Sequence, residues 1–424
     1  MSTLAVIYDR NNVHQLFYSG HRDAIISLEV DAAGKVAATG ELSEFPALHV
    51  WDAKTGCAIK IFERLHRQGI SCLSFSSNNE YLISLGQDVH NSIAICHSPS
   101  RRWADGHHIC STSVSSAKML WCLYSSSNTS FPIVVGGAAG NVFFFRVVRG
   151  SAERVKGVYG KRHKIQPMLC AIDGVVTGSL INASPSPTIS EESAEALPSP
   201  GSMKASAAFS STTNPAAATS TVASMNMMLC GTVTGYIYIF SETRVINKVA
   251  AHEAPINALS VVGKRFLSAG KEGKVKLWSS DMKQLFVFNT AAYLPRPFTI
   301  SCHAVSGSRL GTSFIVGMRS GEVFEVCLQS HSYSLLTEGH SRGELHALDC
   351  NPANPDEYAT AGDDGVVMVW SVGRRYCLRK VRVEAASRAL AYSPDGTQIA
   401  IGFGAGEGHP LASKDGSNIV LFYV

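Results

Sequence analysis

Two short stretches of this 424-residue chain combine residue types that could do chemistry. His107, His108 and Cys110 could ligate a metal ion, but a zinc site needs further ligands at suitable spacing and the sequence suggests none. Residues 402–408 read GFGAGEG, whereas a dinucleotide-binding loop needs the spacing GxGxxG and a following helix. No GxSxG, HExxH or P-loop pattern occurs either. The sequence therefore predicts a protein that is not an enzyme and that holds no metal or cofactor.

Composition indicates an intracellular globular protein. Hydrophobic residues make up 45% of the chain, which is ample for a core, and no run of 18 apolar residues predicts a membrane span. Residues 1–9 lack the basic and apolar regions of a secretion signal. The 11 cysteines contain no CxxC pair and fall singly in apolar stretches, so we expect reduced thiols. A net charge of +4 is too small to predict a nucleic-acid partner.

Short apolar strands must position any functional residue, and they are clearest in residues 339–371. This stretch contains strands at 345–348 and 358–361, an Asp-Asp-Gly turn, and a third strand that ends in Trp370. It resembles one blade of a WD-repeat propeller, a small antiparallel sheet that buries both faces between its neighbours. We therefore expect short apolar strands with polar residues confined to the turns.

In the WD-repeat family, a polar clamp inside the blade links a His, a Ser or Thr, an Asp and a Trp. The matching residues of this blade are His340, Thr360, Asp364 and Trp370. The resemblance implies a structural role for all four, because buried polar groups need hydrogen-bond partners. An earlier blade has Ser268, Glu272 and Trp278 at these positions, and the glutamate in place of aspartate predicts a looser clamp.

The same strand pattern recurs along the chain and predicts an all-β fold, a WD-repeat β-propeller over residues 1–424 with seven complete blades. Strand-like residues at 4–8 and 14–18 are left over at one end, and ALAYS, IAIGFG and IVLFYV at the other. Two interpretations remain open. Either residues 14–18 complete the C-terminal strands as an eighth blade, which would remove open edges, or the chain ends where a second propeller would begin.

The fourth blade contains a low-complexity insertion. Residues 181–224 are rich in Ser, Ala, Pro and Thr, and Phe209 is their one aromatic residue. Such a composition cannot bury enough apolar surface to offset its ordering entropy, so we expect disorder. The Ser-Pro pairs at 184, 186 and 199 are compatible with proline-directed phosphorylation and equally with an unmodified loop.

The order of the repeats is more specific than any one of them. The chain contains RLHRQGISCLSF (64–75), LISLGQDVHNSIAIC (82–96), GKEGKVKLWSSDMK (270–283) and GHSRGELHAL (339–348) in succession. This order resembles the echinoderm microtubule-associated protein-like (EML) family over about residues 6–404. The resemblance implies a microtubule-associated function. Family members also carry a coiled coil, a HELP motif and a second propeller, and relative to them this chain starts after HELP and stops as the second propeller would begin.

Two basic clusters are candidate contacts with tubulin, which is acidic, especially in its tails. The first contains Lys156, Lys161, Arg162, His163 and Lys164, on a loop that enters the fourth blade. The second flanks the outer strand of the seventh blade and contains Arg374, Arg375, Arg379, Lys380 and Arg382. Either cluster could attract an acidic partner, or could be an ordinary solvated loop. No aromatic residues interleave with the charges, which disfavours RNA.

Two functions are therefore compatible with the sequence. The first is a non-enzymatic structural or adaptor protein of microtubules, with a place in the cytoplasm, the cytoskeleton and the axoneme of a cilium or flagellum. The alternative is a general WD-repeat scaffold that assembles a protein complex through its propeller faces without touching tubulin. Neither function involves a membrane or a nucleic acid.

Overall fold

Antiparallel β-strands build the whole described part of the chain. The computed structural model describes residues 3–8, 15–177, 224–290, 301–308, 310–340, 344–374, 376–383, 385–403 and 419–423. Seven four-stranded sheets follow one another, with a two-stranded sheet before them and a three-stranded sheet after them. The predicted fold class and the seven complete blades are confirmed. Among these residues, no helix has the length and hydropathy needed to cross a membrane.

Within each blade, every strand is hydrogen-bonded to the next one along the chain. The first four blades are β3 (Ala24–Val30), β4 (Val36–Leu42), β5 (Leu48–Asp52), β6 (Ala58–Phe62); β7 (Ile70–Phe75), β8 (Tyr81–Gly86), β9 (Ser92–His97), β10 (His107–Ser113); β11 (Met119–Tyr124), β12 (Ile133–Gly137), β13 (Val142–Val148), β14 (Ser151–Lys156); and β15 (Met168–Thr177), β16 (Ser224–Thr232), β17 (Tyr236–Ser241), β18 (Arg244–Ala250). The next three are β19 (Ile256–Val262), β20 (Arg265–Gly270), β21 (Lys274–Trp278), β22 (Gln284–Asn289); β23 (Cys302–Gly307), β24 (Ser313–Met318), β25 (Val323–Cys327), β26 (Tyr333–Thr337); and β27 (Leu345–Cys350), β28 (Glu357–Gly362), β29 (Val366–Ser371), β30 (Tyr376–Arg382).

A small irregularity shows that the blades repeat one structural unit. The register between the first and second strands shifts near the start of the first strand in all seven blades, for example between Ile70 and Cys72 and between Leu345 and Ala347. Such a bulge bends the strand and increases its twist. The recurrence at one position supports the repeat assignment made from the sequence.

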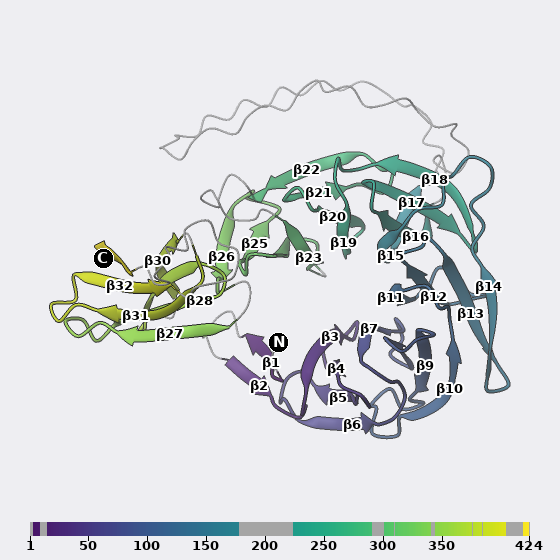
Figure 1. Cartoon of the computed structure of the whole chain (residues 1–424). Helices are drawn as coiled ribbons and strands as arrows, with labels where there is room; N and C mark the ends of the chain where they lie inside the picture. Colours follow the sequence, from purple (N-terminus) through teal and green to yellow (C-terminus); the bar gives the residue numbers. More distant parts are fainter. Residues whose placement is uncertain are drawn as a thin grey trace, which may run out of the picture.

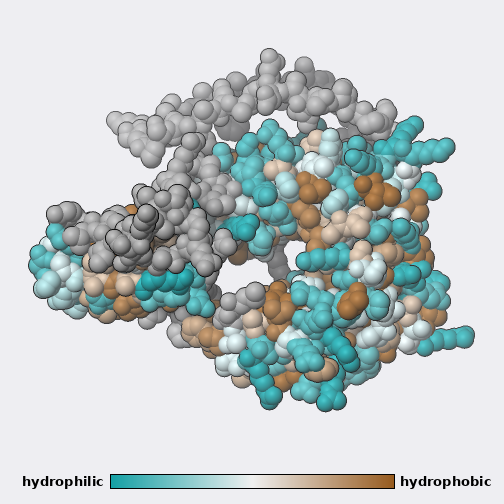
Figure 2. Space-filling model, viewed as in Figure 1, coloured by the Kyte–Doolittle hydropathy of each residue, from teal (hydrophilic) through white to brown (hydrophobic). Residues whose placement is uncertain are grey.

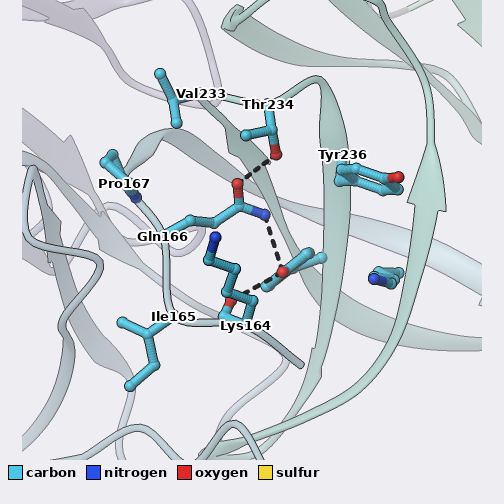
Figure 3. Close-up of a pocket in the computed structure, with 9 residues that line it drawn as sticks. Lys164, Ile165, Gln166, Pro167, Val233, Thr234 and Tyr236 are labelled. Carbon is cyan, nitrogen blue, oxygen red and sulfur yellow. Dashed lines mark hydrogen bonds between the residues drawn. The ribbon is translucent and has the colours of Figure 1, made fainter. Parts of the chain in front are cut away.

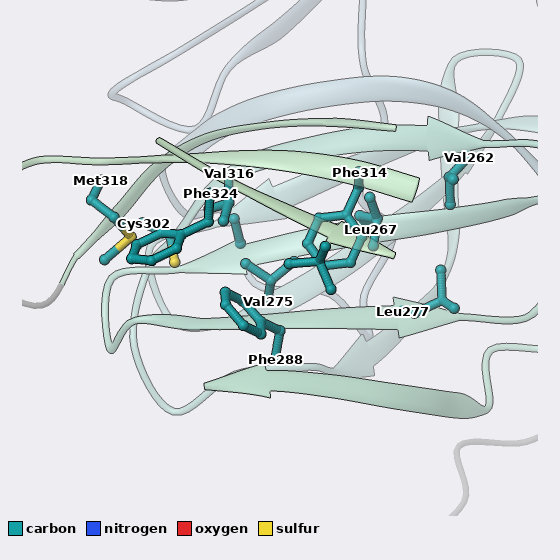
Figure 4. Close-up of a cluster of buried hydrophobic side chains, with 12 residues drawn as sticks. Val262, Leu267, Val275, Leu277, Phe288, Cys302, Phe314, Val316, Met318 and Phe324 are labelled. Atoms are coloured by element: carbon teal, nitrogen blue, oxygen red, sulfur yellow. The ribbon is translucent and has the colours of Figure 1, made fainter. Parts of the chain in front are cut away.

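The core lies between the blades. Figure 4 shows one such layer, in which side chains of the fifth and sixth blades interdigitate. The Phe288 ring on β22 meets the Phe314 and Phe324 rings of the next blade, with centroids 6.2 and 6.0 Å away. A blade covered on both faces needs apolar residues on both faces, which explains the nearly continuous apolar strands in the sequence.

The first six blades form an arc. Their inner strands contact one another in the order β3, β7, β11, β15, β19, β23, and Figure 1 shows the curvature that results. The arc surrounds an opening in the space-filling view of Figure 2. The seventh blade contacts the C-terminal sheet through β27 and β31 (Ser387–Tyr392), and both sheets extend beyond the end of the arc in Figure 1.

Each end of the chain pairs with a strand close to it in sequence. Strand β2 (Gln15–Tyr18) pairs with β1 (Ala5–Tyr8), while β33 (Ile419–Tyr423) pairs with β32 (Gln398–Phe403) and not with residues 14–18. Of the two open interpretations, completion of the C-terminal strands by residues 14–18 is not seen among the described strands, where β31, β32 and β33 form a three-stranded sheet. A hairpin between β1 and β2 closes a very short loop, which costs less entropy than joining strands about 400 residues apart.

The predicted insertion of the fourth blade lies outside the described residues except at its last position. Ser224, assigned to the insertion, is the first residue of β16. Strands β15 and β16 pair along their whole length from Thr177 and Ser224 onward, so the two sides of the insertion meet in one hairpin.

Candidate functional site: a basic pocket on the fourth blade

The seventh blade brings the four predicted clamp residues into hydrogen-bond contact. His340 Nδ1 donates to the Asp364 carboxylate at 3.0 Å, and His340 Nε2 accepts from the Thr360 hydroxyl at 2.8 Å. Trp370 Nε1 donates to Thr360 Oγ1 at 2.7 Å. These bonds tie the loop before β27 to β28, β29 and the turn between them. The hydrogen bonds of this clamp are all made within the seventh blade.

Three other blades contain related clamps. In the fifth blade His252 contacts both Ser268 and Glu272, and Trp278 donates to Ser268 at 2.8 Å, so glutamate completes a clamp there as well. The first blade has one built on His21, Thr39, Glu41 and Trp51. The second uses His66 with Ser84. The sequence analysis missed the first and second clamps, although Gly20-His21 followed by Trp51 repeats the spacing of the seventh blade.

The fourth blade replaces this clamp with an amide and a tyrosine. Gln166 Nε2 donates to the Tyr238 hydroxyl at 2.9 Å, and this hydroxyl donates to the Lys164 carbonyl oxygen at 2.9 Å. Thr234 Oγ1 donates to Gln166 Oε1. The loop histidine, His163, takes no part, and its Nδ1 is shielded from solvent without a hydrogen-bond partner among the described residues.

The loop before the fourth blade is fixed at both ends, so its middle is presented to solvent. At one end Val158 bonds to Thr243 and Val245 with N···O distances of 2.8 and 2.9 Å, and the Tyr159 side chain is buried. At the other end Gln166 is buried. Between these anchors, Lys161, Arg162 and Lys164 are exposed and His163 is half-buried. These three charged residues of the first basic cluster are therefore accessible to a partner.

A pocket of about 400 Å³ lies at the C-terminal end of this loop. Figure 3 shows the Gln166 side chain in it between Thr234 and Lys164. Pro167 and Val233 line it on the apolar side, and Tyr236 and Lys248 come from the adjacent strands β17 and β18. A volume of this size falls within the range of about 300 to 1,000 Å³ found for small-ligand pockets.

A tight turn places the far wall of the pocket. Gly235 has φ +80°, and a Cβ there would lie 1.9 Å from the His252 carbonyl oxygen of the next blade. Only glycine fits this conformation and this close approach. The turn therefore holds Val233 and Thr234 against the Gln166 side of the pocket.

The surroundings of the pocket are positively charged. Burial lowers the pKa of His163, and the charges of Lys248 and Arg162 lower it further. The Lys248 ammonium lies 5.0 Å from the centre of the Tyr236 ring, an arrangement stabilised by the electrons of the ring. Within the part of the chain that the structure describes, no ion pair joins Lys161, Arg162, Lys164 or Lys248 to a carboxylate. The site can therefore hold an anion.

The second basic cluster has a different environment. Lys380 is paired with Glu322 at 2.5 Å and lies 3.9 Å from Glu338, both on the sixth blade. Arg374 is exposed and donates to the Tyr376 hydroxyl at 2.9 Å, and Arg379 is exposed as well. Arg375 lies outside the described residues. Part of this cluster thus serves the contact between two blades.

The candidate metal ligands of the sequence do not converge. His107 and His108 are successive residues of β10, and His108 Nε2 contacts the Ser111 hydroxyl at 2.8 Å. Among the described residues, His21, Glu41 and His49 form the one group close enough to share an ion. His21 and Glu41 already bond to each other there, and His49 bonds to Tyr18 at 2.6 Å. The His21 and His49 rings are stacked, with centroids 3.9 Å apart, so their in-plane lone pairs do not meet at one point.

Sequence reasoning found one side of the pocket and missed the other. Lys164 belongs to a visible run of basic residues, whereas Val233, Tyr236 and Lys248 are 69 to 84 positions further along the chain, beyond the insertion. The Val233 amide donates to the Pro167 carbonyl oxygen at 3.1 Å, which joins the turn before β17 to the loop. The pairing of β17 with β18 sets Tyr236 opposite Ala250 and Tyr238 opposite Lys248, which brings Lys248 beside them. One feature of the sequence could have pointed to this side of the pocket: the fourth blade lacks the combination of histidine, serine or threonine, and tryptophan that forms a clamp in other blades.

Comparison with known proteins agrees with the architecture. The WD domain, G-beta repeat, matches residues 243–279. Echinoderm microtubule-associated protein-like 2 of Mus musculus is 22% identical over 95% of this chain and 54% of its own length. Cilia- and flagella-associated protein 251 of Chlamydomonas reinhardtii is 22% identical over 98% of this chain and 51% of its length. The 77 kDa echinoderm microtubule-associated protein of Lytechinus variegatus is 22% identical over 98% and 55%.

These likenesses extend along nearly the whole chain, which spans about half the length of the curated relatives it matches. The solved structure of U3-55K covers 95% of the chain with a TM-score of 0.45 and 14% identity, too distant to place any residue. The repeat match, the ordered similarity and the seven four-stranded sheets together support a WD-repeat protein that is similar to the EML proteins.

Proposed function

We propose that this protein is a non-enzymatic structural or adaptor component of microtubules, including those of the axoneme of cilia and flagella. The observation that carries the proposal is the similarity, over 95 to 98% of the chain, to proteins named as microtubule-associated or as cilia- and flagella-associated. The predicted location is the cytoplasmic cytoskeleton.

The basic loop of the fourth blade supplies a physical reason for such binding. Lys156 at the end of β14 and Lys161, Arg162 and Lys164 on the loop after it are each exposed, and tubulin is acidic. Charges of opposite sign raise the rate of encounter and align the partners, and salt screens them with a Debye length of about 8 Å at physiological ionic strength. We therefore expect binding that weakens as salt is added.

Co-sedimentation with taxol-stabilised microtubules at two salt concentrations tests the proposal. The parent protein should pellet with microtubules more completely at low salt. The charge reversals Lys161→Glu, Arg162→Glu and Lys164→Glu together should abolish most of this binding, with a thermal melt to check folding. If the folded variant still pellets as the parent does, the loop is not the contact.

One observation favours the alternative, a WD-repeat scaffold without tubulin contact. Val6 and Phe17 lie opposite each other across β1 and β2, and both are exposed. Leu28 and Val30 on β3 are exposed as well. Exposed apolar side chains such as the Val6 and Phe17 pair suit contact with a protein partner. If the parent protein does not pellet with microtubules at either salt concentration, the scaffold function replaces the microtubule function.

A further inference from the structure

Resting on the proposed function, we propose that the fourth-blade pocket is a docking site for an acidic peptide, one that carries an apolar or aromatic side chain among its carboxylates. The pocket provides a positive rim and an apolar wall side by side. A peptide with both kinds of side chain uses both features, whereas a simple anion uses one.

The positive rim comes from two separate elements. Lys164 lies on the loop before β15 and Lys248 on β18, and both line the pocket. A lysine ammonium has three donor hydrogens and accepts none, so it requires an acceptor such as a carboxylate oxygen or water. Neither ammonium is paired with a carboxylate of the described chain. Lys161 and Arg162, exposed on the same loop, extend the positive field outward.

The apolar wall lies next to this rim. Pro167, Val233 and Tyr236 line the pocket and are each half-buried, so part of their surface is open to a ligand. The wall is held in place by the Gln166 and Tyr238 hydrogen bonds beneath it. An apolar side chain that enters removes this surface from water, while neighbouring carboxylates reach the two ammonium groups.

A nucleic acid fits the same site less well. Single-stranded nucleic acids bind through bases stacked on free aromatic faces. Tyr236 has Lys248 over its ring and packs against the core, and Tyr238 is 1% exposed. Tyr236 therefore offers only part of a half-buried ring next to the charges, and Tyr238 offers none. The pocket also lacks the guanidinium fork that grips a phosphate in two directions.

Fluorescence anisotropy with the full chain tests the inference. The probe is a fluorescein-labelled octapeptide of glutamates with one central tyrosine; companion peptides replace the tyrosine with alanine or the glutamates with lysines. We expect the affinity to be highest for the glutamate-tyrosine peptide and lower for the glutamate-alanine peptide. The lysine peptide should not bind. The double variant Lys164→Gln, Lys248→Gln should weaken the first peptide by about tenfold or more, since each charged hydrogen bond is worth about a factor of ten.

A matched control is Lys118→Gln. Lys118 is exposed on the corresponding loop before the third blade and has no ion pair among the described residues. Its replacement should change the affinity by less than about twofold. Val233→Ser, which reduces the apolar wall without altering charge, should erase the preference for tyrosine over alanine. All variants should melt within a few degrees of the parent. If the double variant binds the first peptide as the parent does, the pocket is not the site.

Two further arms separate the possible sources of negative charge. Oligouridylate or inorganic phosphate that displaces the peptide at lower concentration than unlabelled peptide would overturn the inference. Microtubules stripped of their acidic tails by limited subtilisin digestion should retain less protein. If intact and stripped microtubules bind parent and pocket variant equally, the docking site is wrong and the proposed function survives. If the peptide needs the pocket lysines while microtubules do not bind at all, the proposed function is wrong and the docking site survives.

Discussion

The seventh and fourth blades share one strand order and use the polar residues at their loop ends in opposite ways. In the seventh, His340 turns inward and bonds to Thr360 and Asp364. In the fourth, the equivalent loop leaves His163 half-buried with an unpaired Nδ1, and the blade is tied instead by Gln166 and Tyr238. Both blades are four-stranded sheets with the same strand order. They differ in which polar side chains of the loop remain available to bind a partner.

This difference indicates which blades of a repeat protein can carry a binding site. A clamp uses its donors and acceptors internally, which stabilises the blade and leaves nothing for a partner. In the fourth blade Phe240 stands at the register position of the tryptophan. Gln166 and Tyr238 anchor the loop in place of the clamp, and Lys164 and Lys248 face a cavity. A blade with an altered clamp is therefore the first place to look for a binding site in such a ring.

The largest effect on stability is expected from the seventh-blade tryptophan. Trp370→Ala removes a ring stacked on Tyr358 and the donor to Thr360, and it should lower the free energy of unfolding by about 3 to 4 kcal/mol. Urea unfolding measures this. Trp370→Phe retains a ring and should lose less than half as much. A loss below about 1 kcal/mol for Trp370→Ala would mean that the clamp does not stabilise the blade.

Low pH should destabilise the protein more through the buried clamp histidine His66 than through His163 beside the fourth-blade pocket. Burial lowers the pKa of His66 in the second blade to about 4 from its ordinary 6.5. The unfolded chain then takes up a proton first, so stability is complete above about pH 6.5 and falls as the pH drops towards 4, by on the order of 3 kcal/mol for one such histidine. His66→Gln should make the pH dependence shallower, and His49, whose pKa burial also lowers to about 4, should account for part of the remaining slope. The half-exposed His163 should contribute less, so His163→Gln should leave the slope nearly unchanged; a reversed ranking would contradict the contrast.

Removal of the clamp carboxylate should have an intermediate effect. Asp364→Ala leaves the His340 Nδ1 donor and the Val366 amide without their acceptor, at a cost of about 2 kcal/mol. The exposed Asp23 is the matched control, and its alanine variant should stay within about 0.5 kcal/mol of the parent. Thermal unfolding followed by circular dichroism compares the two. Equal melting temperatures for both variants would count against the clamp.

A smaller effect is expected from the replacement clamp of the fourth blade. Tyr238→Phe removes the hydroxyl between Gln166 and the Lys164 carbonyl, and it should cost about 1 kcal/mol because both groups lose a partner. The same variant should weaken the acidic peptide, since Lys164 is no longer held at the pocket. A variant that loses stability without losing peptide affinity would show that the two roles are separate.

The second basic cluster should contribute least. Arg374→Glu with Arg379→Glu changes two exposed charges beside a lysine already paired with Glu322, so we expect microtubule co-sedimentation to fall by less than about twofold. Stability should also be nearly unchanged. A loss as large as that of the fourth-blade charge reversal would show that both clusters contact the partner.

The fold class and the seven blades could be predicted from the amino-acid sequence, because short apolar strands separated by turns are local signals. The four clamp residues of the seventh blade were matched through the resemblance to the WD-repeat family. The sequence also indicated Lys161, Arg162 and Lys164 as a basic run. The three-dimensional structure was needed to show that Lys164 lines one pocket with Lys248 and Tyr236, and that β2 pairs with β1. The pocket depends on which distant strands become neighbours, and side chains separated by some 80 residues share no local pattern from which their proximity can be read.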